Sequence, residues 1–226
     1  MKKILSLILA FTAVILCFAS CGSKNSEDTY IMGSENDPAN KPETTSAPVE
    51  LNYDDAVDDA VKVEMSVKDY GIITLELYPN IAPITVENFV GLVNDGFYDG
   101  LTFHRIDDDF MIQGGDPEGT GMGGSEKQIK GEFTANGYNN PLSHDEGVIS
   151  MARSSQSMDS ASSQFFICLS GNYKSSLDGQ YASFGKVIEG MDVVHAIGKA
   201  EVTDNGYGEK SKPVVTPVIE YVKVVD

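Results

Sequence analysis

One arginine in the segment FHRIDDDFMIQGGD, residues 103–116, stands where its side chain could take part in chemistry. Arg105 lies among aromatic and aliphatic residues, is followed by three aspartates, and precedes the apolar pair Phe110 and Met111. A guanidinium group cannot lose its proton in a protein and presents several donors in a fixed plane. Arg105 is therefore a candidate hydrogen-bond donor. The alternative is a surface arginine paired with one of the aspartates, beside ordinary core residues.

Three other patterns argue against familiar types of site. GTGMGG at 119–124 lacks the G-x-G-x-x-G spacing and no helical pattern follows it, which disfavours a nucleotide site. His104, His144 and His195 lie far apart in the sequence, which disfavours zinc. The serine-rich stretch 150–164 has no G-x-S-x-G elbow, which disfavours a hydrolase. We expect neither a metal nor a cofactor.

Three motifs, in order along the chain, resemble the cyclophilins, which are peptidyl-prolyl cis-trans isomerases. They are FHRIDDDFMIQGGD, SSQFFICLS and LDGQYASFGKVIEGMDVV, and TVENFVGL is similar to the family's first helix. The resemblance spans residues 61–226 and implies a closed eight-stranded antiparallel β-barrel capped by two α-helices. It also implies an enzyme that isomerises X-Pro bonds in proline-containing polypeptides. A cyclophilin-like module that only binds proline segments remains the alternative.

The resemblance implies that Arg105 is the catalytic residue. It places the following residues around the substrate: Phe110, Met111, Gln113, Gly121, Ala152, Arg153, Ser154, Gln164, Phe166, Leu177 and Tyr181. The apolar members would line a proline pocket, and Gln113 would hold a substrate carbonyl or support Arg105. Main-chain groups of residues 152–154 would bind the residue before proline. Asp107–Asp109 are expected to be solvated loop residues that do not neutralise Arg105.

The apolar pattern independently predicts a mainly β fold. Residues 61–79 alternate with a period of two on both sides of Asp69-Tyr70-Gly71, as in an antiparallel hairpin. Residues 82–96 predict a helix with Pro83 in its first turn, and residues 191–199 predict a second, shorter helix. The remaining apolar runs are short and separated by Gly, Asn, Asp and Ser, which is typical of strands closing into a barrel.

The amino terminus is typical of a bacterial lipoprotein signal. Two lysines precede an apolar run that is at the short end for a membrane span, which needs about 20 residues. Ala19 and Ser20 before Cys21 are similar to a lipobox, which implies removal of residues 1–20 and lipidation of Cys21. We therefore expect an exported protein, anchored by lipid at the extracytoplasmic face of a bacterial membrane. An ordinary signal peptide with an incidental cysteine is the alternative.

Residues 21–60 predict an acidic, disordered tether between this anchor and a domain at 61–226. The net charge of −18 opposes nucleic acid and anionic lipid headgroups, so neither is an expected partner. A cation site in DDAVDDA, residues 54–60, is an alternative reading of the tether. Once the signal is removed and Cys21 lipidated, only Cys168 remains, so no internal disulfide is expected. Nothing in the sequence indicates oligomerisation, and we expect a monomer.

Overall fold

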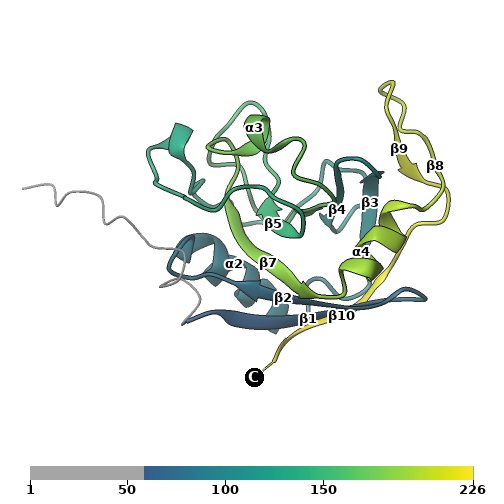
Figure 1. Cartoon of the computed structure of the whole chain (residues 1–226), viewed down its shortest axis with the longest axis horizontal. Helices are drawn as coiled ribbons and strands as arrows, with labels where there is room; N and C mark the ends of the chain where they lie inside the picture. Colours follow the sequence, from purple (N-terminus) through teal and green to yellow (C-terminus); the bar gives the residue numbers. More distant parts are fainter. Residues whose placement is uncertain (1–58, 226) are drawn as a thin grey trace, which may run out of the picture. The chain divides into compact units, whose positions relative to one another are not determined.

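The computed structural model describes residues 59–225 and contains one large antiparallel sheet of eight strands (Figure 1). The predicted signal segment 1–20, Cys21 and nearly all of the tether lie outside these residues. The strands follow one another across the sheet in the order β10-β1-β2-β7-β5-β6-β4-β3. Their bounds are β1 Val61–Val67, β2 Gly71–Leu77, β3 Thr102–Asp107, β4 Met111–Asp116, β5 Val148–Met151, β6 Phe165–Cys168, β7 Ser183–Glu189 and β10 Ile219–Val225.

The expectation of a closed barrel is wrong, because the sheet is open between β3 and β10. These two edges meet at a single bridge, Thr102 to Val218, beside a bond of 3.0 Å from the Phe103 N–H to the Pro217 carbonyl. Pro217 has no N–H and cannot extend the ladder. Beyond that point the chain before β10 no longer follows β3. The result is a half-barrel with a short contact at one end.

Two longer helices pack against the sheet, as the sequence predicted, and a short third helix was not predicted. α2, Pro83–Asn94, contacts β10, whereas α4, Met191–Gly198, contacts β2, β3 and β4. Pro83 occupies the first turn of α2, where its missing N–H costs nothing. The third, α3, has only four residues, Lys174–Leu177, and η1 is a 3-10 turn at Thr134–Asn136. Within residues 59–225 no helix has the length and apolar character to cross a bilayer.

The main core lies against one face of the large sheet. In β2 the buried residues Ile73, Leu75 and Leu77 alternate with more exposed ones, which is the period-two pattern expected of a sheet with one face in the core. Phe89 of α2 is fully buried, with its ring centroid 5.7 Å from Phe165 and 5.3 Å from Phe184. This aromatic contact joins the first helix to the two strands β6 and β7.

A second, two-stranded sheet was missed by the sequence analysis. β8, Val202–Asp204, and β9, Lys210–Pro213, form an antiparallel hairpin that stands beside β3 (Figure 1). Its strands read VTD and KSKP, which are too short and too polar to show the alternation used for the other strands. The hairpin is instead defined by its turn, where the Asn205 N–H donates to the Glu209 carbonyl at 2.9 Å.

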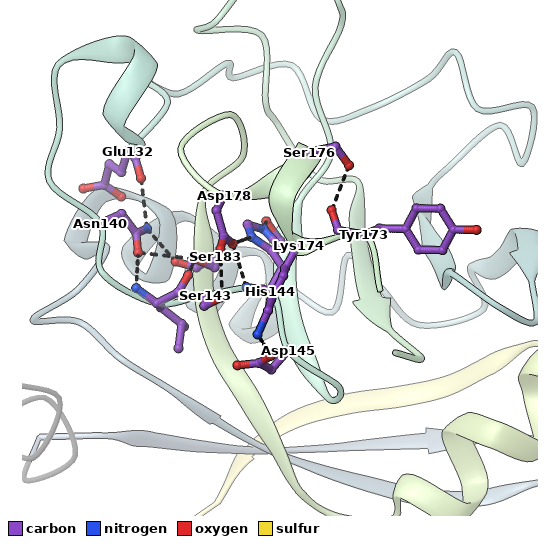
Figure 2. A network of polar contacts seen from close by, with 12 residues as sticks. Glu132, Asn140, Ser143, His144, Asp145, Tyr173, Lys174, Ser176, Asp178 and Ser183 are labelled. Carbon is purple, nitrogen blue, oxygen red and sulfur yellow. Dashed lines mark hydrogen bonds and ion pairs between the residues drawn. The ribbon is translucent and has the colours of Figure 1, made fainter. Parts of the chain in front are cut away.

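The amino terminus of α2 is capped by a residue distant in sequence. Ala82 at the N-cap has no side-chain acceptor, and the buried carboxylate of Glu132 accepts bonds from the Ile84 N–H at 3.1 Å and the Thr85 N–H at 2.8 Å. The Thr85 hydroxyl donates a third bond to Glu132 at 2.7 Å. Asn140 links the loop of Glu132 to β7, donating to the Glu132 and Ser183 carbonyls (Figure 2). A negative charge at a helix amino terminus is stabilising, so Glu132 fastens α2 to the 130s loop.

A buried histidine ties α3 to the sheet. The Nδ1 atom of His144 lies 2.8 Å from the Asp178 carboxylate just after α3 (Figure 2). Its Nε2 atom lies 2.9 Å from the Ser150 hydroxyl on β5. Burial lowers the pKa of His144, although Asp178 acts in the opposite direction. The neutral ring therefore donates to Asp178 and accepts from Ser150. Ser150 is fully buried, so this serine, histidine and aspartate cannot act on a substrate as a hydrolase triad would.

Replacing Glu132 by Gln should lower the free energy of unfolding by about 1–3 kcal/mol, because the helix loses a charged acceptor. Urea denaturation at neutral pH measures the change. Glu126→Gln, at an exposed position of the neighbouring loop, serves as the control and should leave stability unchanged. Equal midpoints for Glu132→Gln and the parent would show that the cap contributes nothing.

The free energy of unfolding should fall as the pH drops from about 7.5 to about 5.5, because the pKa of folded His144 lies below the ordinary value of about 6.5 and the unfolded chain binds the proton more readily. His144→Gln should be less stable at pH 7.5 but should show a shallower dependence on pH. Urea titrations across this range test it. A variant slope as steep as that of the parent would rule out His144 as a source of acid sensitivity.

Candidate functional site

Strand register brings the predicted catalytic arginine and its neighbours into one row, on the face of the sheet opposite the main core. Arg105 on β3 pairs with Gln113 on β4, Gln113 pairs with Phe166 on β6, and Phe166 pairs with Ser150 on β5. Side chains alternate between the faces of a strand, so residues paired across neighbouring strands project to the same side. The three motifs are distant in sequence, and the sheet is what places them together.

The apolar members of the row form a small cluster separate from the main core. Met111, Phe166, Cys168 and Leu177 are buried, and Phe110, Ala152 and Tyr181 pack against them. The rings of Phe166 and Tyr181 meet edge to face, with centroids 5.8 Å apart. Burial raises the pKa of the Cys168 thiol to about 12, so Cys168 acts as a small apolar residue here and not as a nucleophile.

His144 and Asp178 support this apolar cluster. His144 stacks under Phe166 with nearly parallel rings, and Asp178, which holds His144, directly follows Leu177 in the chain. Together these contacts hold Phe166 and, at the end of α3, Leu177 in place.

A chain of side-chain amides begins at Arg105. The NH1 group of Arg105 donates to Gln113 Oε1 at 3.2 Å, and Gln113 Nε2 donates to Gln164 Oε1 at 2.9 Å. Gln164 Nε2 in turn donates to the carbonyls of Gly121 and Gly123, at 3.1 Å and 2.7 Å. Each amide thus has its orientation set by the next. The predicted support of Arg105 by Gln113 is present as a direct hydrogen bond.

The glycine-rich loop at 117–124 is held by Asp116, the last residue of QGGD. The Asp116 carboxylate is buried and accepts bonds from the N–H groups of Glu118 at 2.8 Å, Thr120 at 2.9 Å and Gly121 at 2.6 Å. Burial alone would raise the pKa of Asp116, but these backbone donors outweigh it and the pKa is lowered. The loop therefore folds around a carboxylate, and this explains its glycines without a phosphate.

Arg153 is fixed on the other side of the cleft. Its guanidinium lies over the Tyr181 ring, 4.9 Å from the centroid, and 5.3 Å from the centroid of Phe133. It donates to the carbonyls of Gln180 at 2.9 Å and Ser154 at 3.0 Å. In this segment the Ala152 N–H already bonds to the Gln164 carbonyl and the Ser154 N–H to the Ser160 hydroxyl. Those two N–H groups are engaged within the protein itself.

Every predicted substrate residue lines at least one of two adjoining cavities. A cavity of about 430 Å³ is lined by Arg105, the apolar cluster and Arg153, and a neighbouring cavity of about 630 Å³ lies beneath the 121–125 loop and the 152–156 segment. Gln113, Gly121, Ala152 and Arg153 line both, whereas Ser154 and Gln164 line only the second. The first combines a wall formed by the apolar cluster with charged and polar groups, and the second is lined mostly by polar groups.

The sequence analysis missed one side of the first cavity. Asn205, Tyr207 and Ser211 of the β8–β9 hairpin line it, and Glu209 of the same hairpin forms an ion pair with Arg105, with NH2 and Oε1 separated by 2.7 Å. As expected, no aspartate of 107–109 is paired with Arg105 among the described residues. No motif marked the hairpin, because its polar residues resemble those of any exposed turn.

His104, one of the three histidines that the sequence analysis discounted as zinc ligands, lines the first cavity. Neither of its ring nitrogens has a hydrogen-bond partner within residues 59–225. Burial is the largest cause that lowers the pKa of His104, opposed by Asp116 and reinforced by Arg105. A neutral ring next to Gly121 forms part of the wall, and a Cβ at Gly121 would lie 3.6 Å from His104 Nε2.

Such a cleft offers a fixed, permanently charged donor at the edge of an apolar pocket. The Cys168 thiol and the Ser150 hydroxyl are buried and do not line the first cavity. The arrangement suits a reaction that needs hydrogen-bond donation and dry surroundings, without covalent or proton-transfer chemistry.

Comparison with known proteins agrees with this geometry. The family model described as cyclophilin type peptidyl-prolyl cis-trans isomerase/CLD matches residues 62–224. Peptidyl-prolyl cis-trans isomerase B of Bacillus subtilis is 43% identical over 136 residues, which is 60% of this chain and 90% of that protein. Peptidyl-prolyl cis-trans isomerase-like 1 of Rhizopus delemar is 46% identical over 136 residues, 60% of this chain and 79% of its own.

A crystal structure of a cyclophilin type isomerase from Cryptosporidium parvum, determined in the presence of the dipeptide Ala-Pro, has a TM-score of 0.64 and 30% sequence identity. It covers 73% of this chain and 99% of its own. The chain belongs to the cyclophilin family and is a peptidyl-prolyl cis-trans isomerase.

Proposed function

We propose that Arg105 accelerates rotation about the X-Pro bond by donating a hydrogen bond to the proline nitrogen in the twisted amide. In the planar amide the nitrogen lone pair is delocalised into the carbonyl. In the twisted state the lone pair is localised and accepts a hydrogen bond. A donor aimed at this nitrogen binds the transition state more tightly than either planar isomer, and that difference is what lowers the barrier.

The size of the barrier shows that Arg105 cannot act alone. Shortening a rotation from about 100 s to about 10 ms requires about 5.5 kcal/mol. One charge-assisted hydrogen bond contributes about 1.5–3 kcal/mol. The apolar cluster supplies more, because the twisted amide is less charge-separated than the planar one and is favoured in drier surroundings.

The observation that carries this proposal is the position of the guanidinium at the boundary between polar and apolar groups. Its NH1 bonds to Gln113, and its Cζ atom lies 5.8 Å from the centroid of the Phe110 ring in the proline pocket. A side chain serving only solubility or a surface ion pair would not need the amide chain of Gln113 and Gln164 to orient it. The presence of this oriented donor favours the interpretation that the chain is an enzyme over the alternative of a module that only binds proline segments.

The two cavities suggest how a proline-containing chain lies across the site. The proline ring would lie against the apolar cluster in the smaller cavity, and the preceding residues would extend past Ala152 into the larger one. The dipeptide Ala-Pro used with the structurally similar isomerase supports a proline peptide as the ligand class. Arg153, whose guanidinium is held between two rings, borders both cavities and is placed to affect which preceding residue is preferred.

We infer that the enzyme works outside the cytoplasm. Cys21 would become the lipidated amino terminus after removal of residues 1–20, and the acidic residues 21–60 would tether the isomerase domain to the membrane. Its substrates would be exported polypeptides that fold near the membrane surface. The domain would act there as a monomer.

Arg105→Ala should lower kcat/KM for a proline tetrapeptide by about 10- to 150-fold, which is the loss of one charge-assisted hydrogen bond. The measurement follows isomerisation with the full chain purified in detergent. Arg153→Ala is the matched control, and we expect it to raise KM more than it lowers kcat. If Arg105→Ala and the parent isomerise the peptide at the same rate, the proposed role of Arg105 is wrong.

Mass spectrometry of the protein purified from membranes of an expressing bacterium should find a diacylglyceryl group on Cys21 at the mature amino terminus. Cys21→Ser should stay unprocessed or leave the membrane fraction, because the lipid is the proposed anchor. An unmodified amino terminus at any other residue would refute the lipoprotein assignment.

A further inference from the structure

The β8–β9 hairpin is an addition to the proline cleft that none of the recognised motifs contains. Its turn, residues 205–209, reaches the edge of the first cavity, and Asn205 and Tyr207 line that cavity with Ser211. Tyr207 is 90% exposed at the tip. In Figure 1 the hairpin stands beside β3, the strand that carries Arg105. The hairpin is therefore placed to act on the arginine.

The carboxylate of Glu209 accepts two parallel hydrogen bonds from Arg105. Arg105 Nε donates to Glu209 Oε2 at 3.1 Å, and Arg105 NH2 donates to Glu209 Oε1 at 2.7 Å. A bidentate contact of this kind fixes the plane of the guanidinium as well as its position. With the bond from NH1 to Gln113, the group is held on two of its edges.

The carboxylate of Glu209 is itself held in place. Asn205 Nδ2 and the Ser211 hydroxyl each donate to Glu209 Oε2 at 3.0 Å, and Ser211 is 1% exposed. Asn205 Oδ1 accepts bonds from the Tyr207 N–H at 2.8 Å and the Glu209 N–H at 3.3 Å. Hydrogen bonding from Arg105 is the largest cause that lowers the pKa of Glu209, so this group carries its charge at neutral pH. The hairpin presents an ordered anion to the arginine.

Some N–H groups of Arg105 remain free of Glu209 and Gln113. A guanidinium has five N–H groups. Two bond to Glu209 and one to Gln113, and the remaining two make no hydrogen bond to the protein within residues 59–225. The free N–H groups are on NH1 and NH2, and the Nε edge is the one turned toward the hairpin. Glu209 thus occupies the donors nearest the hairpin and leaves donors available for the substrate.

We propose that Glu209 is a positioning residue, which holds the guanidinium of Arg105 in the plane and orientation from which it donates to the twisted prolyl amide. This inference rests on the proposed role of Arg105. Glu209 does not touch the substrate and acts through the arginine. Both side chains of the pair are about one-third exposed, so the pair contributes little to folding stability. Its effect is on the position of the guanidinium, because a small misplacement of the donor lowers the reaction rate.

Glu209 could also act in the opposite direction, by lowering the rate of isomerisation. A carboxylate against the guanidinium could weaken the arginine as a donor or draw it away from the substrate. Glu209 would then restrain the enzyme, and removing its charge would raise the rate. The two effects have opposite signs, so one substitution separates them.

The test is Glu209→Gln in the full chain purified in detergent, with kcat and KM measured separately on a proline tetrapeptide. We expect kcat to fall about 10-fold with KM little changed, since the transition-state donor is misplaced and substrate binding is not. The thermal midpoint should match that of the parent. Glu64→Gln is the matched control, because Glu64 makes an ion pair of 2.7 Å with Lys223 and lines neither cavity.

An Arg105→Lys background provides the second measurement. Lysine cannot make the bidentate contact, so adding Glu209→Gln to it should lower kcat no further. An unchanged or higher kcat in Glu209→Gln alone, a change confined to KM, or an equal loss with and without Arg105 would each overturn the inference. Failure of the role of Arg105 would look different, because Arg105→Ala would then retain the rate of the parent.

Discussion

A charged guanidinium at the edge of an apolar pocket is the interaction on which the site depends. Arg105 carries a permanent charge, which needs polar partners, yet it must also donate toward the apolar cluster. The structure meets this constraint by giving the arginine protein partners on two edges, Glu209 and Gln113, while its Cζ atom lies over the Phe110 ring. The proline reaction needs a group that donates without giving up a proton, and arginine is the side chain with this property.

Most of the surrounding structure holds that arrangement in place. His144 supports Phe166 from below, and its bond to Asp178 fixes the turn that follows Leu177. On the opposite side of the cleft, Gln164 connects the amide chain of Arg105 to the loop around Asp116. Buried polar groups of this kind are costly unless they are fully bonded. Their presence beside the cleft indicates that they serve its geometry.

The sequence contained most of the fold and most of the cleft. Eight apolar runs correspond to the eight strands of the large sheet, and Pro83 marked the first turn of α2. The site residues were accessible because FHRIDDDFMIQGGD and SSQFFICLS resemble family motifs, whereas without that resemblance Phe110 and Met111 read as ordinary core. Closure of the barrel was wrongly expected, because alternation describes each strand and does not say whether the last edge meets the first.

The β8–β9 hairpin could not be predicted for a different reason. Its turn, Asn205 to Glu209, is polar and rich in glycine, as exposed turns generally are. The value of Glu209 lies in a contact 104 positions away in the sequence, which no local pattern records. Asp107–Asp109 were expected to be solvated, and the carboxylate that pairs with Arg105 is instead Glu209, on the hairpin beside β3.

The central claim is that Arg105 acts on the twisted amide and not on the bound ground state. Nuclear magnetic resonance of one proline peptide, mixed with the parent or with Arg105→Ala, reports binding from chemical shifts and catalysed exchange from the cross-peaks between cis and trans forms. The account predicts that the variant binds the peptide with nearly the affinity of the parent while the exchange rate collapses. Loss of affinity and exchange in equal proportion would contradict it, since Arg105 would then be a binding residue.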